Sequence, residues 1–308
     1  MTWHAVVVTM IVKPMATATK LENFMSENQP AGTLFVVATP IGNLDDITLR
    51  AVDVLKSVGI VAAEDTRHSR VLLAHIGAAP ARVLSLHDHN EGSRSEQLVG
   101  LLQQGHDVAL VSDAGTPLVS DPGFELVRLA RASGLRVVPI PGPSAVMAVL
   151  SASSLPVDRF YFEGFLPVRA AARRKRLVEL ASLSVSVVFF EAARRLRDTL
   201  QDLEQIIEPD RQVLLAKELT KIHERIESGS IAALLSRLED GEFFEAGEFV
   251  CMLGPQTTAR AADADSVATL MHVLCEELAP TQAARIGARI TSRPRRELYE
   301  YALTLQRR

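Results

Sequence analysis

Cysteine is scarce in this chain: among 308 residues there are only Cys251 and Cys275, each among apolar neighbours. Two such cysteines are better explained as buried thiols than as a disulfide, which favours a reducing compartment, and we expect a cytoplasmic protein. His68, His75, His87 and His89 lack the H-E-x-x-H spacing and have no cysteine nearby, so we expect no metal site. His87 and His89 could ligate a metal in principle, but solvated or hydrogen-bonded histidines are the better explanation.

Long apolar runs and the common nucleotide-binding motifs are also absent. No segment approaches the roughly 18 apolar residues of a membrane-spanning helix, and we expect no membrane association. The apolar run from Val6 to Val12 is short and has no basic residues before it, which argues against a signal peptide. Neither G-x-x-x-x-G-K-[ST] nor G-x-G-x-x-G after a strand occurs, which disfavours P-loop and dinucleotide-binding enzymes.

Positive charge is not in excess either. The 33 Lys and Arg against 37 Asp and Glu give a formal net charge of −4. This excludes a uniformly basic nucleic-acid-binding protein, so any contact with a polyanion must come from local basic patches.

What the sequence does contain is a regular alternation of apolar runs and amphipathic segments, which predicts an α/β fold whose pattern restarts after Pro156. The predicted strands are at 33–39, 59–63, 82–86, 107–112, 136–140, 159–163, 184–190, 211–217 and 247–253. The predicted helices are at 47–57, 68–76, 92–104, 122–133, 143–152, 170–181, 193–206, 229–238, 265–278, 281–290 and 294–305.

The length favours two domains plus an appendage over a single core. We expect two α/β domains, a polar linker and a small helical appendage, preceded by a disordered extension. The expected boundaries are 1–31 for the extension, 32–154 and 155–254 for the domains, 255–265 for the linker and 266–308 for the appendage.

Three loops after predicted strands are rich in Gly, Pro, Ser, Thr and Asp, at 40–46, 112–123 and 141–145. Ligands of open α/β sheets bind at the carboxyl ends of the strands, where these loops lie. Gly allows close approach of the backbone and Pro fixes the loop shape. Ordinary connections run about 2–6 residues, and the loop after Val111 is longer. These loops therefore predict a ligand site.

Six segments closely resemble one enzyme family. They are VATPIGNLDDIT (37–48), AAEDTRHS (62–69), VSDAGTPLVSDPG (111–123), PIPGPSAV (139–146), FYFEGFLP (160–167) and AKELTKIHE (216–224). In this order they resemble the RsmI family of ribosomal RNA small-subunit 2'-O-methyltransferases, which belongs to the tetrapyrrole-methylase-like group. The C-terminal helices resemble the helix-turn-helix-like appendage of the same enzymes.

The resemblance implies two α/β domains of the tetrapyrrole-methylase type with the active site in the cleft between them. It implies a homodimer that uses S-adenosyl-L-methionine to methylate the 2'-hydroxyl of a cytidine in the decoding region of 16S rRNA, in the small ribosomal subunit. The residues that it assigns to cofactor binding are Pro40, Ile41, Gly42, Asp113, Ala114, Gly115, Thr116, Ser120, Pro141, Gly142, Ser144, Phe190, Glu191 and Ala192. Ser144 also has a structural explanation, because Ser commonly begins a helix.

Methyl transfer to a hydroxyl requires alignment of the reactants and removal of a proton. Two charged clusters follow predicted strands, at 64–68 and 217–224. Our hypothesis is that a lysine of lowered pKa in the second cluster takes or orients the hydroxyl proton while a glutamate tunes it. Solvated loops with ion pairs are the alternative. The candidate catalytic residues are Glu64, His68, Lys217, Glu218 and Lys221.

Two basic patches favour a polyanionic partner. The segment 169–176 carries five cations and no acid, and the tail carries seven arginines against two glutamates. A basic helix can also be merely a solvated face. The expected RNA-binding residues are Arg67, Arg169, Arg173, Arg174, Lys175, Arg176, Arg194, Arg195, Arg293, Arg295 and Arg296.

One segment departs from the family pattern. After the strand that ends at Phe190 these enzymes usually read Glu-Ala-Pro-His-Arg, whereas this chain reads Glu-Ala-Ala-Arg-Arg over 191–195. The titratable His is absent, and we expect the two arginines to bind RNA phosphate or the cofactor carboxylate.

Two alternatives remain open. A tetrapyrrole (precorrin) methyltransferase would share the fold but would not need the basic patches. A non-catalytic nucleic-acid-binding protein would not need Asp113, Gly115 or the Pro-Gly at 141–142.

Overall fold

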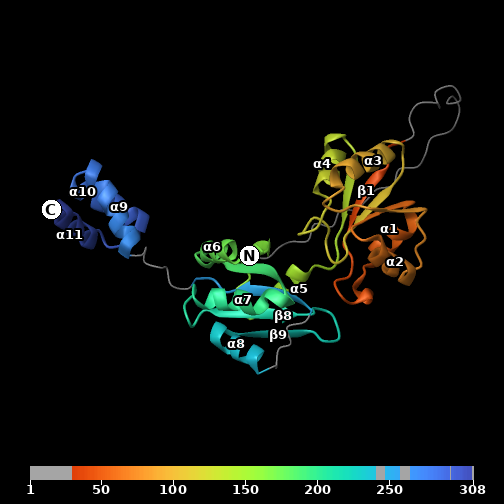
Figure 1. The fold of residues 1–308 in the computed structure, drawn as a ribbon. Helices are drawn as coiled ribbons and strands as arrows, with labels where there is room; N and C mark the ends of the chain where they lie inside the picture. The colour runs from red at the N-terminus through yellow and green to blue at the C-terminus, as the bar shows by residue number, and fades with distance from the viewer. Residues whose placement is uncertain (1–29, 241–246, 257–263, 292, 307–308) are drawn as a thin grey trace, which may run out of the picture.

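The computed structural model describes residues 30–240, 247–256, 264–291 and 293–306. These residues form two five-stranded sheets and a group of C-terminal helices (Figure 1). Every predicted strand and helix is present, to within about two residues at each end. Most of the predicted extension at 1–31, namely residues 1–29, and most of the linker at 255–265 lie outside the described residues.

The first sheet is parallel throughout, in the order β3-β2-β4-β1-β5. All of β2 and β4 is buried, because helices cover both faces. Helices α1 and α2 cover one face, and α3 and α4 cover the other. The elements are β1 (Thr33–Val37), α1 (Leu49–Ser57), β2 (Ile60–Ala63), α2 (Thr66–His75), β3 (Arg82–Ser85), α3 (Glu91–Gln103), β4 (Val108–Val111), α4 (Phe124–Ala132) and β5 (Arg136–Ile140).

The second sheet has the order β6-β7-β10-β8-β9, and only its β6–β7 pair is parallel. The hydrophobic pattern does not predict β9, because this edge strand contains a single apolar residue, Ile226, and pairs with β8 alone. The strands are β6 (Phe160–Phe165), β7 (Ser186–Ala192), β8 (Gln212–Lys217), β9 (Arg225–Ser230) and β10 (Glu248–Leu253).

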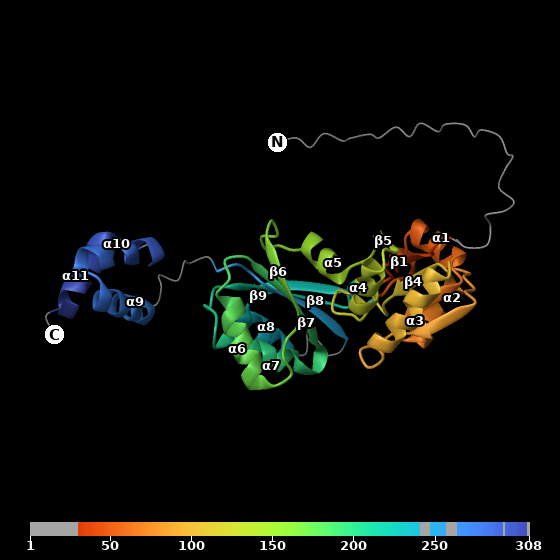
Figure 2. The ribbon, with the colours of Figure 1, turned by 90° about the horizontal axis from the view of Figure 1, so that it is seen from above.

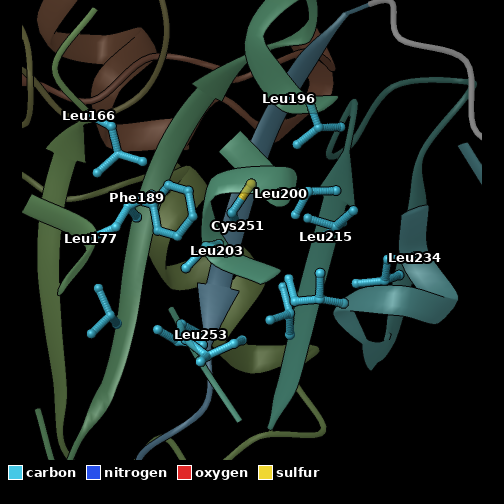
Figure 3. Close-up of a cluster of buried hydrophobic side chains, with 14 of the residues drawn as sticks. Leu166, Leu177, Phe189, Leu196, Leu200, Leu203, Leu215, Leu234, Cys251 and Leu253 are labelled. Atoms are coloured by element: carbon cyan, nitrogen blue, oxygen red, sulfur yellow. The ribbon is translucent and has the colours of Figure 1, made fainter. Parts of the chain in front are cut away.

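One face of the second sheet is covered by α6 (Ala170–Ala181), α7 (Ala193–Glu204) and α8 (Ile231–Glu239). Figure 3 shows the core between them, in which Phe189 of β7 lies among leucines of the helices. Cys251 lies in this core and is fully buried, which confirms a buried thiol at this position, and burial raises its pKa. Cys275 is only partly buried, so the expectation of a buried thiol is wrong there.

The opposite face of the second sheet packs against α5 (Ala145–Ser151). This helix directly follows the first sheet in the chain, yet Val149 and Leu150 pack with Val188 and Leu214 of the second sheet. The α5 helix therefore brings the carboxyl-end loops of the first sheet against the second sheet.

The C-terminal helices α9 (Ala264–Glu277), α10 (Pro280–Thr291) and α11 (Arg295–Gln306) pack on one another. Their core includes Met271, Ala283 and Leu298. Both views show them as a separate group (Figures 1 and 2). Within the described residues, no helix combines the length and apolarity that crossing a bilayer requires.

We expect Gly287→Ile to disrupt this helical group selectively. A Cβ at Gly287 would lie 2.7 Å from Sδ of Met271 and 3.3 Å from Cδ1 of Leu298. Overpacking of this kind costs about 1–3 kcal/mol, a large share of the stability of so small a core. Limited proteolysis should show faster cleavage within α9–α11, with an unchanged thermal transition for the two sheets.

The matched control is Gly92→Ile in α3, because a Cβ at Gly92 would meet no atom within 4 Å. Unchanged protease resistance of α9–α11 in Gly287→Ile would contradict the described packing.

Candidate functional site

Hydrogen bonds join the loops that follow β1, β4 and β5. The amide of Thr39 donates to the carbonyl of Gly115 at 2.8 Å, and the amide of Gly115 donates to the carbonyl of Thr39 at 3.0 Å. The hydroxyl of Thr116 donates to the carbonyl of Pro143 at 3.1 Å. Gly115 has a φ of +90°, which strains any residue with a side chain. The three Gly/Pro loops therefore form one connected unit.

A cavity of about 400 Å³ lies between this unit and the second sheet. Its size is typical of pockets for small molecules and cofactors, about 300–1,000 Å³. The lining residues are Ile41, Glu64, Asp113, Ala114, Gly115, Thr116, Val119, Ser120, Asp121, Ser144, Ala145, Val146, Phe165, Phe190, Glu191, Ala192, Ala216, Leu219, Gly247, Glu248, Phe249 and Val250.

Most residues predicted to bind the cofactor line this cavity, namely Ile41, Asp113, Ala114, Gly115, Thr116, Ser120, Ser144, Phe190, Glu191 and Ala192. Ser144 fits both explanations considered for it. It lines the cavity, and its hydroxyl accepts a hydrogen bond from the amide of Met147 at the start of α5. The predicted residues outside the lining are Pro40, Gly42, Pro141 and Gly142.

The two glycines outside the lining allow close packing of the loops around the cavity. A Cβ at Gly42 would lie 2.4 Å from Cγ of Lys221, in the loop after β8. A Cβ at Gly142 would lie 3.2 Å from Cβ of Ala38. Any larger residue at position 42 would push the two halves of the site apart.

Three carboxylates, Glu64, Asp113 and Asp121, line the first-sheet side of the cavity. Asp113 is fixed by the amide of Asp65, which donates to its Oδ1 at 2.9 Å. Burial and then the charge of Asp113 raise the pKa of Glu64. Burial and then the charge of Glu64 raise the pKa of Asp121 to about 6. The cavity thus holds a carboxyl group whose pKa lies well above that of an ordinary aspartate.

Within the cluster at 64–68, only Glu64 lines the cavity. The side chain of His68 is 71% exposed, and its Nδ1 lies 4.0 Å from Oδ2 of Asp113. Arg67 pairs with Asp65 at 2.7 Å, and this hydrogen bond holds the pKa of Asp65 well below its usual range. His68 therefore lies beside the site rather than in it.

In the cluster at 217–224, Lys221 is held by two carboxylates. Its Nζ donates to Glu218 Oε1 at 3.1 Å and to Glu248 Oε2 at 3.0 Å. Burial opposes the lysine charge, but the two hydrogen bonds raise the pKa of Lys221 above its ordinary value. The hypothesis of a lysine with lowered pKa is therefore wrong for Lys221. Lys217 lies at the end of β8, outside the cavity lining.

Glu218 anchors the loop after β8. Its Oε1 accepts from the amide of Glu248 at 2.9 Å as well as from Lys221. Burial raises the pKa of Glu218, but the hydrogen bonds with Glu248 and Lys221 outweigh this effect. The pKa of Glu218 is therefore lower than its ordinary value. This loop contributes Leu219 to the cavity wall.

Two loops beside the cavity hold strained backbone. The non-glycine residues with positive φ in the described chain are Leu118 (72°), Ser120 (70°), Glu218 (50°) and Thr220 (66°). Such conformations cost roughly 1–3 kcal/mol each, persist only where the surroundings fix them, and cluster at functional sites. Their position supports the cavity as the functional site.

Glu191, at the end of β7, is buried and fully hydrogen-bonded. Its Oε1 accepts from the Ala192 amide at 2.8 Å and from Arg195 Nε at 2.6 Å, and its Oε2 accepts from the Thr199 hydroxyl at 2.7 Å. Arg195 also donates to the carbonyl of Leu166 at 3.1 Å. The assignment of Arg195 to RNA binding is therefore wrong, because its guanidinium is held inside, whereas Arg194 is exposed.

Acids within α6 and on neighbouring elements compensate much of its positive charge, so the prediction of uncompensated cations is wrong. Arg173 is 4% exposed and its Nε donates to Asp202 at 2.8 Å, which removes it from any RNA interface. Arg176 pairs with Glu163 and Glu179, each at 2.7 Å. The exposed cations of α6, α7 and the residue before α6 are Arg169, Arg174, Lys175 and Arg194.

Within the described residues, the arginines of the tail are only partly paired. Arg293 donates to Glu297 at 2.7 Å, and Arg296 donates to Glu300 at 3.1 Å. Arg295 and Arg296 are exposed. These two side chains remain accessible on α11.

The sequence pattern does not single out Asp121, Phe165 or Leu219, although all three line the cavity. Each lies in a segment that carries the family resemblance, so a signal was present. Which residue of a segment faces the cavity depends on loop backbone that periodicity cannot supply. Within the described part of the chain, no group of three or more His, Cys, Asp and Glu side chains could hold a metal ion.

Comparison with known protein families identifies two matching regions. Residues 33–235 match the Tetrapyrrole (Corrin/Porphyrin) Methylases, and residues 260–306 match the RsmI C-terminal HTH domain. These matches confirm the resemblance found in the sequence.

Individual proteins agree with this. The chain is 44% identical over 287 residues to ribosomal RNA small subunit methyltransferase I of Escherichia coli O157:H7, covering 93% of this chain and 100% of the relative. It is 47% identical over 268 residues to the enzyme of the same name from Xylella fastidiosa (strain Temecula1 / ATCC 700964), covering 87% and 98%.

Among solved structures, uroporphyrin-III C-methyltransferase from Thermus thermophilus, complexed with S-adenosylhomocysteine, has a TM-score of 0.52 at 18% identity. The similarity covers 72% of this chain and 97% of that one. At this identity it shows the fold alone, which is the two-sheet tetrapyrrole methylase fold with additional C-terminal helices.

We expect Arg173→Met and Lys175→Ala to affect different properties. Arg173→Met leaves the buried carboxylate of Asp202 without its main partner, and breaking a buried pair costs about 3–5 kcal/mol, so Tm should fall. Lys175→Ala should leave Tm unchanged and lower the slope of log affinity for RNA against log salt by up to about 1. Calorimetry and RNA titrations at several salt concentrations measure both. Unchanged Tm with weaker RNA binding in Arg173→Met would restore an RNA role for Arg173.

Proposed function

Because the chain belongs to the Tetrapyrrole (Corrin/Porphyrin) Methylases and, within them, to the ribosomal RNA small subunit methyltransferase I enzymes, we propose that it methylates the ribose 2'-hydroxyl of a cytidine in the decoding region of 16S rRNA, with S-adenosyl-L-methionine as donor. The observation that carries this is the cavity that joins three Gly/Pro loops, a carboxylate cluster and apolar walls. Identity of 44% and 47% to the rRNA enzymes favours RNA over a tetrapyrrole as substrate. The cluster of three carboxylates and the strained loops favour catalysis over simple binding.

The cavity has the chemistry to hold S-adenosylmethionine. Buried Ile41, Leu219 and Val250 offer an apolar wall for an adenine, and the backbone at Gly115 is open to close approach. The carboxylate of Asp113 is suited to hydroxyl or ammonium groups. When bound, the cofactor supplies a methyl group on a positively charged sulfur, which the acidic wall complements.

We assign proton removal to Asp121. As the ribose oxygen takes the methyl group, its proton passes to a carboxylate oxygen of Asp121. Burial and the neighbouring Glu64 raise the pKa of Asp121 to about 6, so the group is mostly ionised at neutral pH yet more basic than an ordinary aspartate. Glu64 thus acts through Asp121.

Exposed cations beside the cavity would bind the rRNA backbone. The parallel strands β6 and β7 both end at the cavity, so α6 and α7 begin at the same edge, where Arg169 and Arg194 are exposed. Arg174 and Lys175 extend this surface along α6, and Arg295 and Arg296 provide a second contact on α11. We also propose that the protein acts as a homodimer in the cytoplasm, where small ribosomal subunits are available.

The direct test is incubation with labelled S-adenosylmethionine and assembled small subunits, protein-free 16S rRNA or a tetrapyrrole precursor, followed by mapping of the methylated position. We expect label on a decoding-region cytidine 2'-oxygen, with assembled subunits preferred because the target is recognised within folded RNA. Methylation of the tetrapyrrole alone, or RNA binding with no transfer, would overturn the proposal.

Asp121→Asn should lower the rate of methyl transfer by about 100-fold or more, because a general base contributes roughly 10²–10⁴-fold. In the wild type the single-turnover rate should rise with pH through about 6 and then level off, since the ionised carboxylate accepts the proton. The same raised pKa means that ionisation of Asp121, beside Glu64 and Asp113, lowers the stability of the fold as the pH rises from about 4 to about 6, and this loss stays constant at higher pH. Asp121→Asn should therefore raise Tm at pH 8 and change it little at pH 4.

Asp53→Asn, on the exposed side of α1, is the control and should change neither property. Near wild-type turnover in Asp121→Asn at saturating substrates would remove Asp121 from the proton transfer.

A further inference from the structure

Phe165 is the large apolar residue that both lines the cavity and stands open to solvent in the described chain. Its side chain is 59% exposed, at the carboxyl end of β6. An aromatic ring that is exposed to water at the mouth of a ligand cavity does not contribute the folding free energy that burial of its apolar surface would give. Such a ring is suited to a planar partner that arrives from outside.

A bulge in β6 turns this ring toward the cavity. Phe162 and Phe165 are three residues apart, so regular alternation would place them on opposite faces of the strand. The β6–β7 register shifts between them, and both rings contact Phe190, with centroids at 5.1 Å and 5.4 Å. Phe190 therefore packs against Phe165 and helps to hold its ring at the cavity.

The bulge also brings the ring near the carboxylate loop. Gly164 has a φ of +76°, and a Cβ there would lie 3.0 Å from Oγ of Ser120. Asp121 is the next residue in that loop and lines the same cavity. A planar group on Phe165 would therefore place attached atoms close to the carboxylates.

Building on the proposed function, we propose that Phe165 is the stacking platform for the base of the target nucleotide, which leaves the RNA stack to reach the cavity. A nucleobase removed from its neighbours loses their stacking, and an aromatic side chain replaces it. The cofactor adenine is the less suitable occupant, because Ile41, Leu219 and Val250 offer it an enclosed wall. A base stacked on Phe165 carries its ribose toward Asp121.

The other aromatic residues of β6 do not have this arrangement. Tyr161 is engaged by Arg176, whose Nη2 donates to its hydroxyl at 2.9 Å. Phe160 is 38% exposed but lies outside the cavity lining. Phe160 therefore provides a matched control on the same strand.

The test compares Phe165→Ala, Phe165→Leu, Phe165→Tyr and Phe160→Ala, with kcat/KM measured on assembled small subunits and Kd for S-adenosylmethionine measured by calorimetry. We expect Phe165→Ala and Phe165→Leu to lose about 10- to 100-fold in kcat/KM while Kd for the cofactor changes less than about twofold. Phe165→Tyr should retain most activity because it keeps the ring, and Phe160→Ala should match the wild type. Melting temperatures of all variants should stay close to that of the wild type, since Phe160 and Phe165 are both exposed.

Wild-type activity in Phe165→Leu would show that the ring is not needed and would overturn the platform. A parallel loss of cofactor affinity in Phe165→Ala would assign the ring to the cofactor adenine instead. Both results leave the proposed function intact, whereas failure of the wild type to methylate any rRNA substrate would remove that function and the platform with it.

Discussion

The site depends on the reciprocal hydrogen bonds between Thr39 and Gly115. These two bonds join loops that leave neighbouring strands β1 and β4, and they require a backbone conformation at position 115 that side chains rarely adopt. Thr39 is buried and its hydroxyl donates to the carbonyl of Ser112 at 3.1 Å, so the same residue also fixes the start of the second loop. Asp113 and Asp121 follow in that loop, and their placement beside Glu64 rests on this pairing.

The second constraint is the apolar contact between the two halves. Ile41 from the loop after β1 and Leu219 from the loop after β8 lie in one hydrophobic cluster with α5, so the cavity walls are held by packing across the cleft. Such packing is close and resists small shifts, which suits a site that must align two reactants. Because Gly42 has no side chain, the side chain of Lys221 can pack directly against the loop after β1.

The sequence predicted the features that depend on local hydrophobic patterns. It did not predict those that depend on contacts between residues far apart in the chain. The strands β2 and β4 are buried on both faces and read as continuous apolar runs, so their positions and the ligand-binding edge were predictable. The edge strand β9 has almost no hydrophobic signal. The partner of Arg173 is Asp202, 29 residues away, so a local count of charges could not detect it. The raised pKa of Lys221 likewise depends on Glu248, which β-sheet pairing brings near.

The carboxylates of Glu191 and Asp121 show how environment separates a structural acid from one suited to chemistry. Glu191 is buried, but three donors satisfy its oxygens, so its charge is compensated and it organises β7 and α7. Asp121 is partly buried beside two like charges, and its pKa rises to about 6 because burial and Glu64 both disfavour the ionised form. Retaining such an arrangement lowers stability at neutral pH, and it persists because strained loop backbone and the Thr39–Gly115 pairing hold the group in place. The environment that lowers stability at Asp121 is thus the one that makes its carboxylate a stronger base. Asp121 and Phe165 line the same cavity.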